Sequence, residues 1–470
     1  MNVRDAVLKL FSAKLFLMVL QFGAIAYFTR ELGTDVIGSF FLFQAVIGII
    51  AIPSNLGLRR SAEKQLSAGE DAGEVIGTTV LLKSILLLPF LVLILLLRSY
   101  IGTYIGIQGV ALFVAIGLTA TQARRLVIRL LAGQMRISQT ANLRVVGKLT
   151  WLIGGILFIS QGFGPSSILI AFILEHFVVV VGGLLQLDIS FSRPTKNRAR
   201  SLLSFGWFIS LRSSGNIMYS WMDVIILGFF VSTSLIGAYE IAWRVASVGL
   251  HLTNSIRESI FPQISKLYTQ GQLDEISELL YRWIQLPFYL TIPALAGAVV
   301  LGREVLGVPF GQEVVLALPV LVLFMAEKIM RTVHLLYSAA IFAMNRPNLG
   351  YRGEIVGLFT NLVLNLALIP KFGILGGAAA TTASSIITAL VNVYYLSSIV
   401  DLCIPVRRIG WSVLSATLMA VGVYIVKSFL SSGWTGLIIG VSIGVGMYGT
   451  FLMLDPEIRH EIRRLMKTVR

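Results

Sequence analysis

Two long, mainly apolar segments separated by a short polar turn occupy residues 203–261, which read LSFGWFISLRSSGNIMYSWMDVIILGFFVSTSLIGAYEIAWRVASVGLHLTNSIRESIF. Each segment, 203–231 and 235–261, exceeds the roughly 20 apolar residues that are needed to cross about 30 Å of hydrocarbon. Because the bilayer core holds no water, the backbone of such a segment must satisfy its hydrogen bonds internally, which favours a helix. The stretch therefore predicts a hairpin of two transmembrane helices that turns at residues 232–234.

The same criterion predicts twelve further spans. They lie near residues 11–29, 36–57, 75–97, 107–131, 143–160, 166–187, 282–301, 313–343, 351–369, 374–397, 409–430 and 433–454. Hydrophobic residues make up 56% of the 470 positions and charged residues only 13%, whereas soluble globular domains have about 25% charged residues. The sequence therefore predicts an all-α integral membrane protein with about fourteen transmembrane helices.

The distribution of lysine and arginine predicts the orientation, because cytoplasmic loops of membrane proteins are enriched in both. With the N-terminus placed in the cytoplasm, 28 of the 38 basic residues fall on the cytoplasmic side, 5 on the opposite face and 5 inside spans. This split predicts a multi-pass protein of the cell membrane with both termini in the cytoplasm. The net charge of +15 then follows from topology and contact with membrane lipids, and does not indicate nucleic-acid binding.

The two halves of the sequence resemble each other at an offset of about 200 residues. The matches are IGSF at 37–40 with IGAY at 236–239, Arg136 with Arg346, Val146-Gly147 with Val356-Gly357, and Phe163-Gly164 with Phe372-Gly373. The first and seventh helices both start on the inner side, so the repeat is parallel. It predicts two six-helix lobes around a central cavity, at residues 1–190 and 191–400, followed by two helices and a basic cytoplasmic tail at 401–470.

Ionisable side chains inside spans are costly and usually mark a functional site or an internal pair. In the hairpin, Asp223 lies ten residues before the turn and Arg244 eleven residues after it, so both are about 15 Å deep at about 1.5 Å per residue. Glu240 is one turn from Arg244 and can share it. These residues form either a structural salt bridge or a contact to substrate, and Arg212 is predicted nearer the inner face.

Segment 313–343 carries Glu327, Lys328, Arg331 and His334. Glu327, Arg331 and His334 are spaced by four and three residues and share one helix face, which must be hydrated or paired. We expect this face to line the cavity. In segment 75–97, Lys83 lies near the inner end and either extends its ammonium toward the interface, the simpler interpretation, or joins the cavity.

Several functions find no support in the sequence. It contains no nucleotide-binding G-x-x-x-x-G-K-[ST] loop and no H-E-x-x-H or G-x-S-x-G motif. Cys403 is the sole cysteine and the histidines lack a second ligand at useful spacing, so neither a disulfide nor a metal site is predicted. We expect no cofactor.

Three stretches resemble the polysaccharide-transporter (oligosaccharide flippase) family, within the multidrug/oligosaccharidyl-lipid/polysaccharide exporter superfamily. The first, 204–275, has Asp223 before IILG, then GAY at 237–239, and Pro262 followed by an amphipathic linker. The others are TRELGTDVIGSFFLFQAVI at 29–47, with NLGL at 55–58, and NLVLNLALIPKFGILGGAAATTAS at 361–384. Together with the helix number, the resemblance covers nearly the whole chain.

The resemblance implies a flippase that moves a polyprenyl-phosphate-linked glycan from the inner to the outer leaflet by alternating access. The phosphate linker would need cationic partners away from bulk water. Candidates in this sequence are Arg212, Arg244, Arg331 and Lys83 in the cavity, with Arg59 and Arg60 for headgroup entry, although topology alone also explains the last two. A coupling ion, H⁺ or Na⁺, stays open.

Two alternatives remain within the superfamily. A cation-coupled multidrug antiporter is one, but such exporters often use an acidic residue in the first helix, and residues 11–29 contain no Asp or Glu. A peptidoglycan-precursor flippase is another, and nothing in the sequence separates the glycan cargoes. A membrane glycosyltransferase or polymerase would need acidic residues on a sizeable outer loop, and the predicted outer loops are too short. The chain is thus predicted not to be an enzyme.

Overall fold

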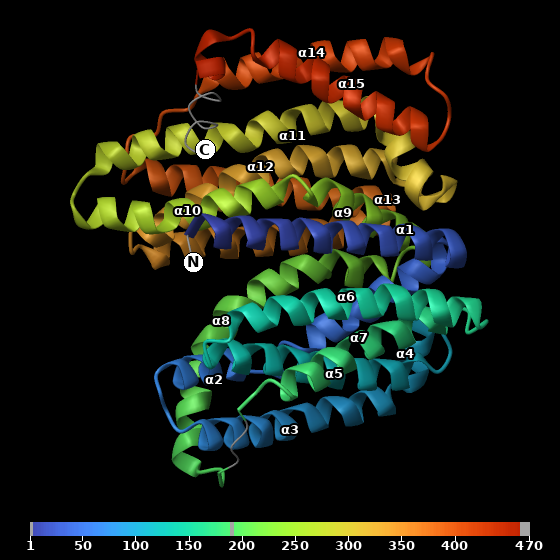
Figure 1. Cartoon of the computed structure of the whole chain (residues 1–470), viewed down its shortest axis with the longest axis vertical. Helices are drawn as coiled ribbons and strands as arrows, with labels where there is room; N and C mark the ends of the chain where they lie inside the picture. The colour runs from blue at the N-terminus through green and yellow to red at the C-terminus, as the bar shows by residue number, and fades with distance from the viewer. Residues whose placement is uncertain (1–2, 189–191, 461–470) are drawn as a thin grey trace. The chain divides into compact units, whose positions relative to one another are not determined.

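The computed structural model describes residues 3–188 and 192–460, and within them the side chains of all but residues 3–16, 208–209, 211–214 and 216. The described backbone consists of helices and connecting turns and contains no β-strand (Figure 1). In chain order the elements are α1 (Val3–Ile50), α2 (Leu58–Ser67), α3 (Ala72–Leu96), α4 (Arg98–Ile105), α5 (Val110–Gly133), α6 (Ile137–Ser160), α7 (Ser166–Leu184), α8 (Lys196–Leu227), α9 (Thr233–Ser247), α10 (Leu250–Thr269), α11 (Leu273–Phe310), the 3-10 helix η1 (Gln312–Ala317), α12 (Leu318–Ala343), α13 (Pro347–Ser397), α14 (Val406–Lys427) and α15 (Trp434–Leu452).

Each segment predicted to span the membrane is mainly helical, although 36–57 extends past the end of α1 and 235–261 covers both α9 and α10. Two long helices contain two predicted segments each, and a glycine with a non-helical backbone breaks both: Gly33 in α1 and Gly373 in α13. Among the described residues, nine helices are long and apolar enough to cross a bilayer. The all-α membrane class is confirmed, and the number of about fourteen spans stays a prediction.

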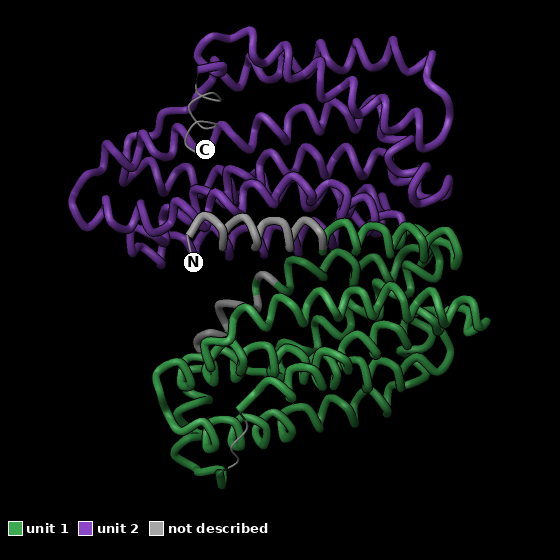
Figure 2. Tube along the Cα trace, viewed as in Figure 1, with its two compact units in different colours: residues 1–237 green, residues 238–470 purple. Residues whose placement is uncertain are grey.

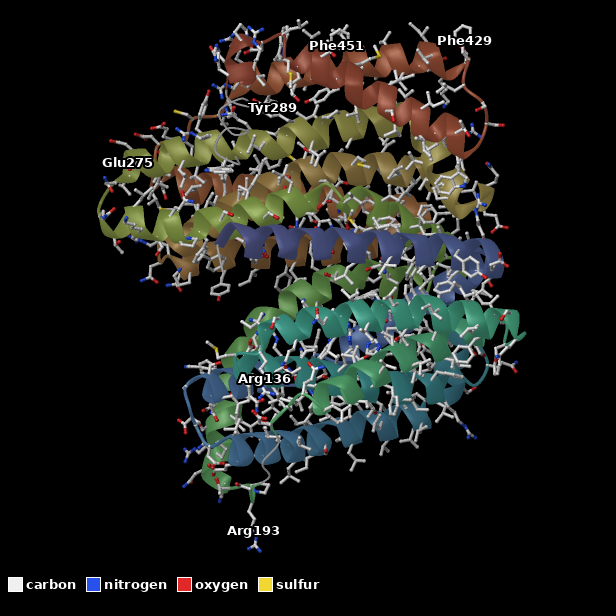
Figure 3. The ribbon with its side chains drawn as sticks, viewed as in Figure 1. Arg136, Arg193, Glu275, Tyr289, Phe429 and Phe451 are labelled. Carbon is white, nitrogen blue, oxygen red and sulfur yellow. The ribbon has the colours of Figure 1, made fainter. Side chains whose placement is uncertain are left out.

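The outer surface of several helices is apolar, as expected of a protein whose solvent is lipid. Phe429, at the end of α14, is 84% exposed, and Tyr424 and Val445 are also exposed; Phe429 is labelled in Figure 3. Exposed apolar patches on soluble monomers rarely exceed a few hundred Å². The side chains that α14 and α15 turn outward therefore suit contact with acyl chains.

The chain divides into two compact units, residues 1–237 (unit 1) and 238–470 (unit 2) (Figure 2). Within unit 1, α8 packs against α1, α2 and α3. The predicted lobes at 1–190 and 191–400 describe a sequence repeat rather than packing, and they stay a prediction.

An aromatic cluster forms much of the interior of unit 1. The ring of Trp151 on α6 lies 5.1 Å from that of Phe28 and 5.8 Å from that of Phe40, both on α1. Phe172 on α7 makes edge-to-face contacts with Phe40 and Phe43. Such rings bury large apolar surfaces and favour this geometry, so the cluster fixes α1 against α6 and α7.

The repeat-matched stretches that contain Gly38 and Gly237 contact each other within unit 1. A Cβ atom added to Gly38 would overlap the carbonyl group of Thr233, and one added to Gly237 would overlap the carbonyl oxygen of Thr34. The hydroxyls of Thr34 and Ser234 are 2.8 Å apart and share a hydrogen bond. Only glycine allows two helices to approach this closely, so the matched sequence IG serves a helix crossing.

The amphipathic linker after Pro262 is helical on both sides of a turn. Helix α10 continues through Pro262 to Thr269, and α11 begins at Leu273 after a turn at Gly271, whose φ is 72°. Ile276 and Leu280 are buried in the core of unit 2, whereas Leu273 is exposed and Leu279 is partly buried. Part of the apolar face of this linker therefore packs against the core of unit 2.

Candidate functional site

One face of α5 carries three polar side chains on a mainly apolar helix. Gln122, Arg125 and Arg129 are spaced by three and four residues, which places them on one side of a helix. Gln122 contacts residues 51–54, just before α2, and Arg129 contacts Glu63 on α2. The two segments therefore run in parallel, and their contacts form successive levels along the α5 face.

The first level is a network of amides around a lysine. The Nε2 group of Gln122 donates to the carbonyl oxygen of Ala51 at 3.2 Å and to the hydroxyl of Ser54 at 2.6 Å. The ammonium of Lys83, on α3, donates to Oε1 of Gln122 at 3.0 Å and to Oδ1 of Asn55 at 3.1 Å. Lys83 is 6% exposed, so the interpretation that it extends to the interface was wrong.

An apolar cavity lies beside this network, between α3, α5 and α7. Its volume is about 250 Å³, and Val80, Leu87 and Leu184 contribute to its wall. Among the described residues that line it, Lys83 alone carries a charge, and Ser84, Thr119 and Gln122 are the other polar members. The cavity thus places a cation at the edge of an apolar volume.

The third level is a salt bridge. The Arg129 guanidinium lies 2.9 Å from the Glu63 carboxylate, and both side chains are partly exposed. One turn further, the hydroxyl of Ser67 donates to the carbonyl oxygen of Gly133 at 3.4 Å. Charges are therefore balanced at this level.

The second level lies between the Gln122 network and the Arg129–Glu63 salt bridge. It differs from both because it holds two arginines. Arg59 precedes Glu63 by one turn of α2, and Arg125 precedes Arg129 by one turn of α5. The Nε group of Arg59 is buried without a hydrogen-bond partner among the described residues. Burial is the main cause that lowers the pKa of Arg59, to about 9, and the positive charges of Arg125, Arg129 and Arg60 add to it.

A second cluster of charges lies between α5, α6 and α7. The carboxylate of Glu175 is fully buried and lies 3.4 Å from Arg124 and 3.3 Å from Lys148. The ring of the neighbouring His176 shares a 2.8 Å hydrogen bond with the carbonyl oxygen of Phe172. Glu175 therefore neutralises basic groups of its own unit.

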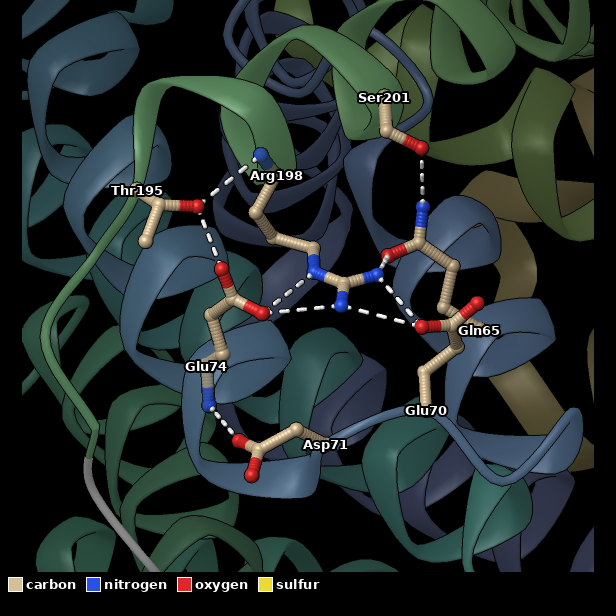
Figure 4. A network of polar contacts seen from close by, with 7 residues as sticks. All are labelled: Gln65, Glu70, Asp71, Glu74, Thr195, Arg198 and Ser201. Atoms are coloured by element: carbon tan, nitrogen blue, oxygen red, sulfur yellow. Dashed lines mark hydrogen bonds and ion pairs between the residues drawn. The ribbon is translucent and has the colours of Figure 1, made fainter.

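The start of α8 is attached to α2 and α3 by a third network, shown in Figure 4. The Arg198 guanidinium donates to the carboxylates of Glu74 at 2.9 Å and Glu70 at 3.1 Å, and to the side-chain oxygen of Gln65 at 3.2 Å. Thr195 accepts from the backbone N–H of Arg198 and donates to Glu74. This network fixes the N-terminal end of α8 within unit 1.

In unit 2, the charges of α12 face α13. The carboxylate of Glu327 lies 2.6 Å from the ammonium of Lys328 and accepts a 2.8 Å hydrogen bond from Ser385 of α13. The Lys328 ammonium also lies 5.2 Å from the ring centre of Trp243. Both charged side chains are buried, so the pair neutralises itself inside the unit.

His334 occupies the other end of the same α12 face. Its Nδ1 atom and Nδ2 of Asn392 are 2.7 Å apart and share a hydrogen bond, and its Nε2 atom lies 3.5 Å from the Glu354 carboxylate. Arg331, between Glu327 and His334, is half-buried. The face is therefore paired with α13, and its role in lining a cavity stays a prediction.

The predicted residues of the hairpin have different outcomes. The side chain of Arg212 lies outside the described residues. Glu240 and Arg244 form an ion pair one helical turn apart on α9, as predicted. Asp223 is buried in unit 1, whereas Arg244 belongs to unit 2, so their pairing stays a prediction.

Sequence reasoning selected Arg59 and Arg60 but missed the arginines of α5. Arg60 is exposed and Arg59 is not, so the two neighbours differ in environment. Arg124, Arg125 and Arg129 were counted among cytoplasmic residues for topology. Their position inside a 24-residue apolar helix was the available signal, because arginines on a span are rarely placed there without a partner or a role.

An all-helical, multi-spanning membrane protein with ionisable side chains buried on its spans has the features of a membrane transporter. A family model described as "Polysaccharide biosynthesis protein" matches residues 34–317. A relative from Haloferax volcanii, named "Probable low-salt glycan biosynthesis flippase Agl15", is 34% identical over 460 residues, which cover 98% of this chain and 97% of the relative. The chain therefore belongs to this family of polysaccharide biosynthesis proteins, as the sequence resemblance predicted.

Solved structures share the fold at low sequence identity. A structure described as the lipid II flippase MurJ in an inward closed conformation matches with a TM-score of 0.78 and 15% identity, over 95% of this chain and 98% of that chain. An inward-facing multidrug resistance MATE family transporter of the MOP superfamily matches with a TM-score of 0.68 and 15% identity, over 81% and 94% of the two chains. Family and relatives confirm that the chain is a membrane transporter and not an enzyme.

Proposed function

We propose that this protein is a flippase that moves a lipid-linked oligosaccharide or polysaccharide precursor from the inner to the outer leaflet of the cell membrane by alternating access. The observation that carries the proposal is the excess of cations along the α5 face of unit 1, where Arg59 and Arg125 share a level without an acid among the described residues. An anionic lipid linker supplies the missing charge. The name of the Haloferax volcanii relative supports the same substrate class.

A vesicle assay tests this function. The purified full chain is reconstituted into liposomes with a fluorescent prenyl-diphosphate disaccharide, and a membrane-impermeant reductant bleaches the probe in the outer leaflet. We expect the protein to raise the fraction of probe that becomes bleachable, because inner-leaflet probe is delivered outward. A bleachable fraction equal to that of protein-free liposomes would contradict the proposal.

The orientation, with both termini in the cytoplasm, forms part of the proposal. Cys403 is the sole cysteine and is exposed, and it precedes the basic pair Arg407 and Arg408, which the positive-inside rule assigns to the cytoplasm. An impermeant maleimide added to intact cells should therefore leave Cys403 unlabelled, and should label it after the membrane is opened. Labelling of Cys403 in intact cells would place this residue outside the cell and contradict the proposed orientation.

A cation-coupled multidrug antiporter is the second candidate, favoured by the likeness of the fold to the MATE family structure. The absence of Asp and Glu from residues 11–29 argues against it. Expression in a drug-sensitive host separates the two functions, since only the antiporter would raise resistance to cationic drugs. For either function, abolishing the H⁺ or the Na⁺ gradient separately identifies the coupling ion.

A further inference from the structure

The apolar cavity of unit 1 has a volume of about 250 Å³ and is lined by residues of α3, α5 and α7. Helices α3 and α7 both pack against α5. The wall consists mainly of aliphatic side chains such as Ile76, Leu126 and Val180. An engineered apolar cavity of about 150 Å³ in another protein stays dry and binds benzene. The cavity of unit 1 is therefore large enough for a hydrocarbon ligand.

The polar side chains on this wall form hydrogen bonds within the protein. The hydroxyls of Ser84 and Thr119 each donate to a carbonyl oxygen one turn back on their own helix, at 3.0 and 2.9 Å. The ammonium of Lys83 donates to Gln122 and Asn55, and the amide of Gln122 donates to residues 51–54. A buried water needs roughly two to four polar partners. Because the polar groups of the wall are engaged elsewhere, the cavity suits hydrocarbon better than water or an anionic headgroup.

The cavity opens on the side of unit 1 that faces lipid. Val80 on α3 and Leu184 on α7 line it and are 41% and 43% exposed, and Ser84 and Thr119 are also exposed. Helix α3 has the most apolar candidate span of the described residues, with a mean hydropathy of 2.6. The cavity is therefore continuous with an apolar surface that contacts lipid chains.

The length of the cavity matches the hydrocarbon of one leaflet. Its wall extends from Ile76 to Leu87 on α3 and from Thr119 to Leu130 on α5. Each pair is eleven residues apart, which corresponds to about 16 Å at about 1.5 Å per residue. The hydrocarbon core of a bilayer is about 30 Å thick, so one leaflet contributes about 15 Å. Because Ile76 lies one turn after Ala72, the first residue of α3, the cavity extends from near one end of the span toward its middle.

We propose that this cavity is a binding site for one hydrocarbon chain of a lipid from the bulk bilayer. Its wall recognises a chain and not a headgroup, so the abundant lipids of the membrane are the occupant rather than a rare lipid-linked substrate. The bound chain fills the space between α3 and α7, where an empty volume would deprive the lining atoms of contacts. The site does not depend on the proposed flippase function.

Photolabelling in liposomes tests the site. The purified full chain is reconstituted into phosphatidylcholine liposomes in which a small fraction of the lipid carries a diazirine on one chain, and the labelled residues are identified by mass spectrometry after irradiation. Leu126 and Leu130 line the cavity but are only 6% and 3% exposed, so a chain that stays on the outer surface cannot reach them. We expect label on both leucines and on Ile85 of α3, which is 57% exposed. Label confined to exposed residues such as Ile85 would overturn the site.

Filling the cavity provides the matched comparison. Ala123 lines it on α5, and Ala123→Phe places a ring in the volume, so the label on Leu126 and Leu130 should fall to the background of protein that was not irradiated. The smaller Ala123→Leu should cause a partial loss. Ile85→Phe adds a ring on an exposed position of α3 and should leave the label on both leucines unchanged. Undiminished label on these leucines in Ala123→Phe would contradict the proposal.

Thermal unfolding in detergent shows whether the chain stabilises unit 1. A ligand that binds only the folded state raises the unfolding temperature. Added phosphatidylcholine should therefore raise the unfolding temperature of the wild type and of Ile85→Phe more than that of Ala123→Phe. If the larger ring prevents folding, Ala123→Leu takes its place in this comparison. An equal rise in all variants would mean that lipid stabilises the protein elsewhere, and would overturn the site.

Competition distinguishes the two sources of a hydrocarbon chain. A long-chain polyprenyl phosphate without a diazirine, added to the liposomes at low mole fraction, should leave the label on Leu126 and Leu130 unchanged, because bulk lipid outnumbers it. A large loss of label would assign the cavity to the chain of a lipid-linked substrate and contradict the proposed occupant. None of these measurements involves transport, so a failure of the vesicle flipping assay leaves the site intact, and a failure of the site leaves the flippase function intact.

Discussion

Units 1 and 2 share backbone features at positions 210 or 209 residues apart, yet they differ in charge. Met135 and Asn345 have φ values of 61° and 56°, unusual for residues other than glycine, and each ends the turn before a span. Gly164 and Gly373 both have a φ of 55°. Repeated sequence thus coincides with repeated backbone geometry, as expected of an internal repeat.

Apart from the matched Arg136 and Arg346, the charged side chains of the α5 face do not follow this repeat. At the offset of 210, Arg125 corresponds to Leu335 and Arg129 to Ala339. The buried acids of unit 2 have basic partners within the unit, such as Glu327 with Lys328. Unit 1 instead leaves the Arg59 level without an acid in the described residues. The difference teaches that the glycines and turns maintain a common scaffold in both units, while the charged side chains on that scaffold differ.

Removing the acid of the buried pair in unit 2 should have the largest effect. Glu327→Gln keeps the side-chain volume but leaves the ammonium of Lys328, whose side chain is 4% exposed, without a counter-charge. Breaking a buried pair in this way costs about 3–5 kcal/mol of the free energy of unfolding. Chemical unfolding in detergent measures it.

Glu278→Gln serves as the control for this prediction. Glu278 pairs with Arg282 one turn away on α11, and both side chains are more than half exposed, so its loss should cost at most about 0.5 kcal/mol. A loss below about 1 kcal/mol for Glu327→Gln would mean that the interior of unit 2 does not depend on charge balance. The contrast between the units would then disappear.

Replacing Lys83, the lysine buried in unit 1, should have an intermediate effect on the free energy of unfolding. Lys83→Met removes the donor to Asn55 and Gln122 and leaves two buried amide oxygens unsatisfied, which costs about 1–3 kcal/mol. The substitution also removes a positive charge near Arg59, which opposes this cost. The loss of unfolding free energy should therefore fall at the lower end of that range. Thermal unfolding measures it against Lys371→Met, an exposed lysine; a more stable Lys83→Met protein would mean that repulsion outweighs the hydrogen bonds.

The positions of the helices could be predicted from the sequence because hydropathy is a local property. Each predicted span is mainly helical, and the repeat directed attention to Gly373, where the structure breaks α13. The break between α9 and α10 at residues 248–249 was missed, since the mainly apolar stretch 235–261 predicts one continuous span. Hydropathy locates membrane segments but contains no information on such local turns.

The site was harder to predict because its partners are distant in the sequence. Glu63 and Arg129 are 66 residues apart, and nothing local to either predicts their contact. Counting basic residues explained Arg125 as a topological signal, which concealed its position opposite Arg59. The pairing of Lys83 with amides rather than with lipid headgroups likewise depends on Asn55 and Gln122, which approach only in the folded unit.

The smallest expected effects concern arginines that attach chain segments within each unit, Arg198 partly buried and Arg407 exposed. Arg198 of unit 1 is 15% exposed and binds two carboxylates, whereas Arg407 of unit 2 is 68% exposed and contacts Asp455 and Glu457. Exposed pairs contribute little because water and salt screen them. Arg198→Gln should therefore increase backbone hydrogen exchange at the start of α8 by about two- to fivefold, and Arg407→Gln should leave exchange at the start of α14 unchanged.

Salt dependence sharpens this last comparison. At about 1 M salt the Debye length falls to about 3 Å, so exposed ion pairs are screened while less accessible ones are screened less. The wild type should keep most of its protection at the start of α8 under these conditions, because the Arg198 network also contains the neutral partner Gln65. Arg193→Gln, at an exposed position three residues before α8, provides the matched control. If backbone hydrogen exchange at the start of α8 is no faster in Arg198→Gln than in Arg193→Gln, the network does not fix α8. The ion pairs of Arg198 and Arg407 would then contribute equally little to the two units.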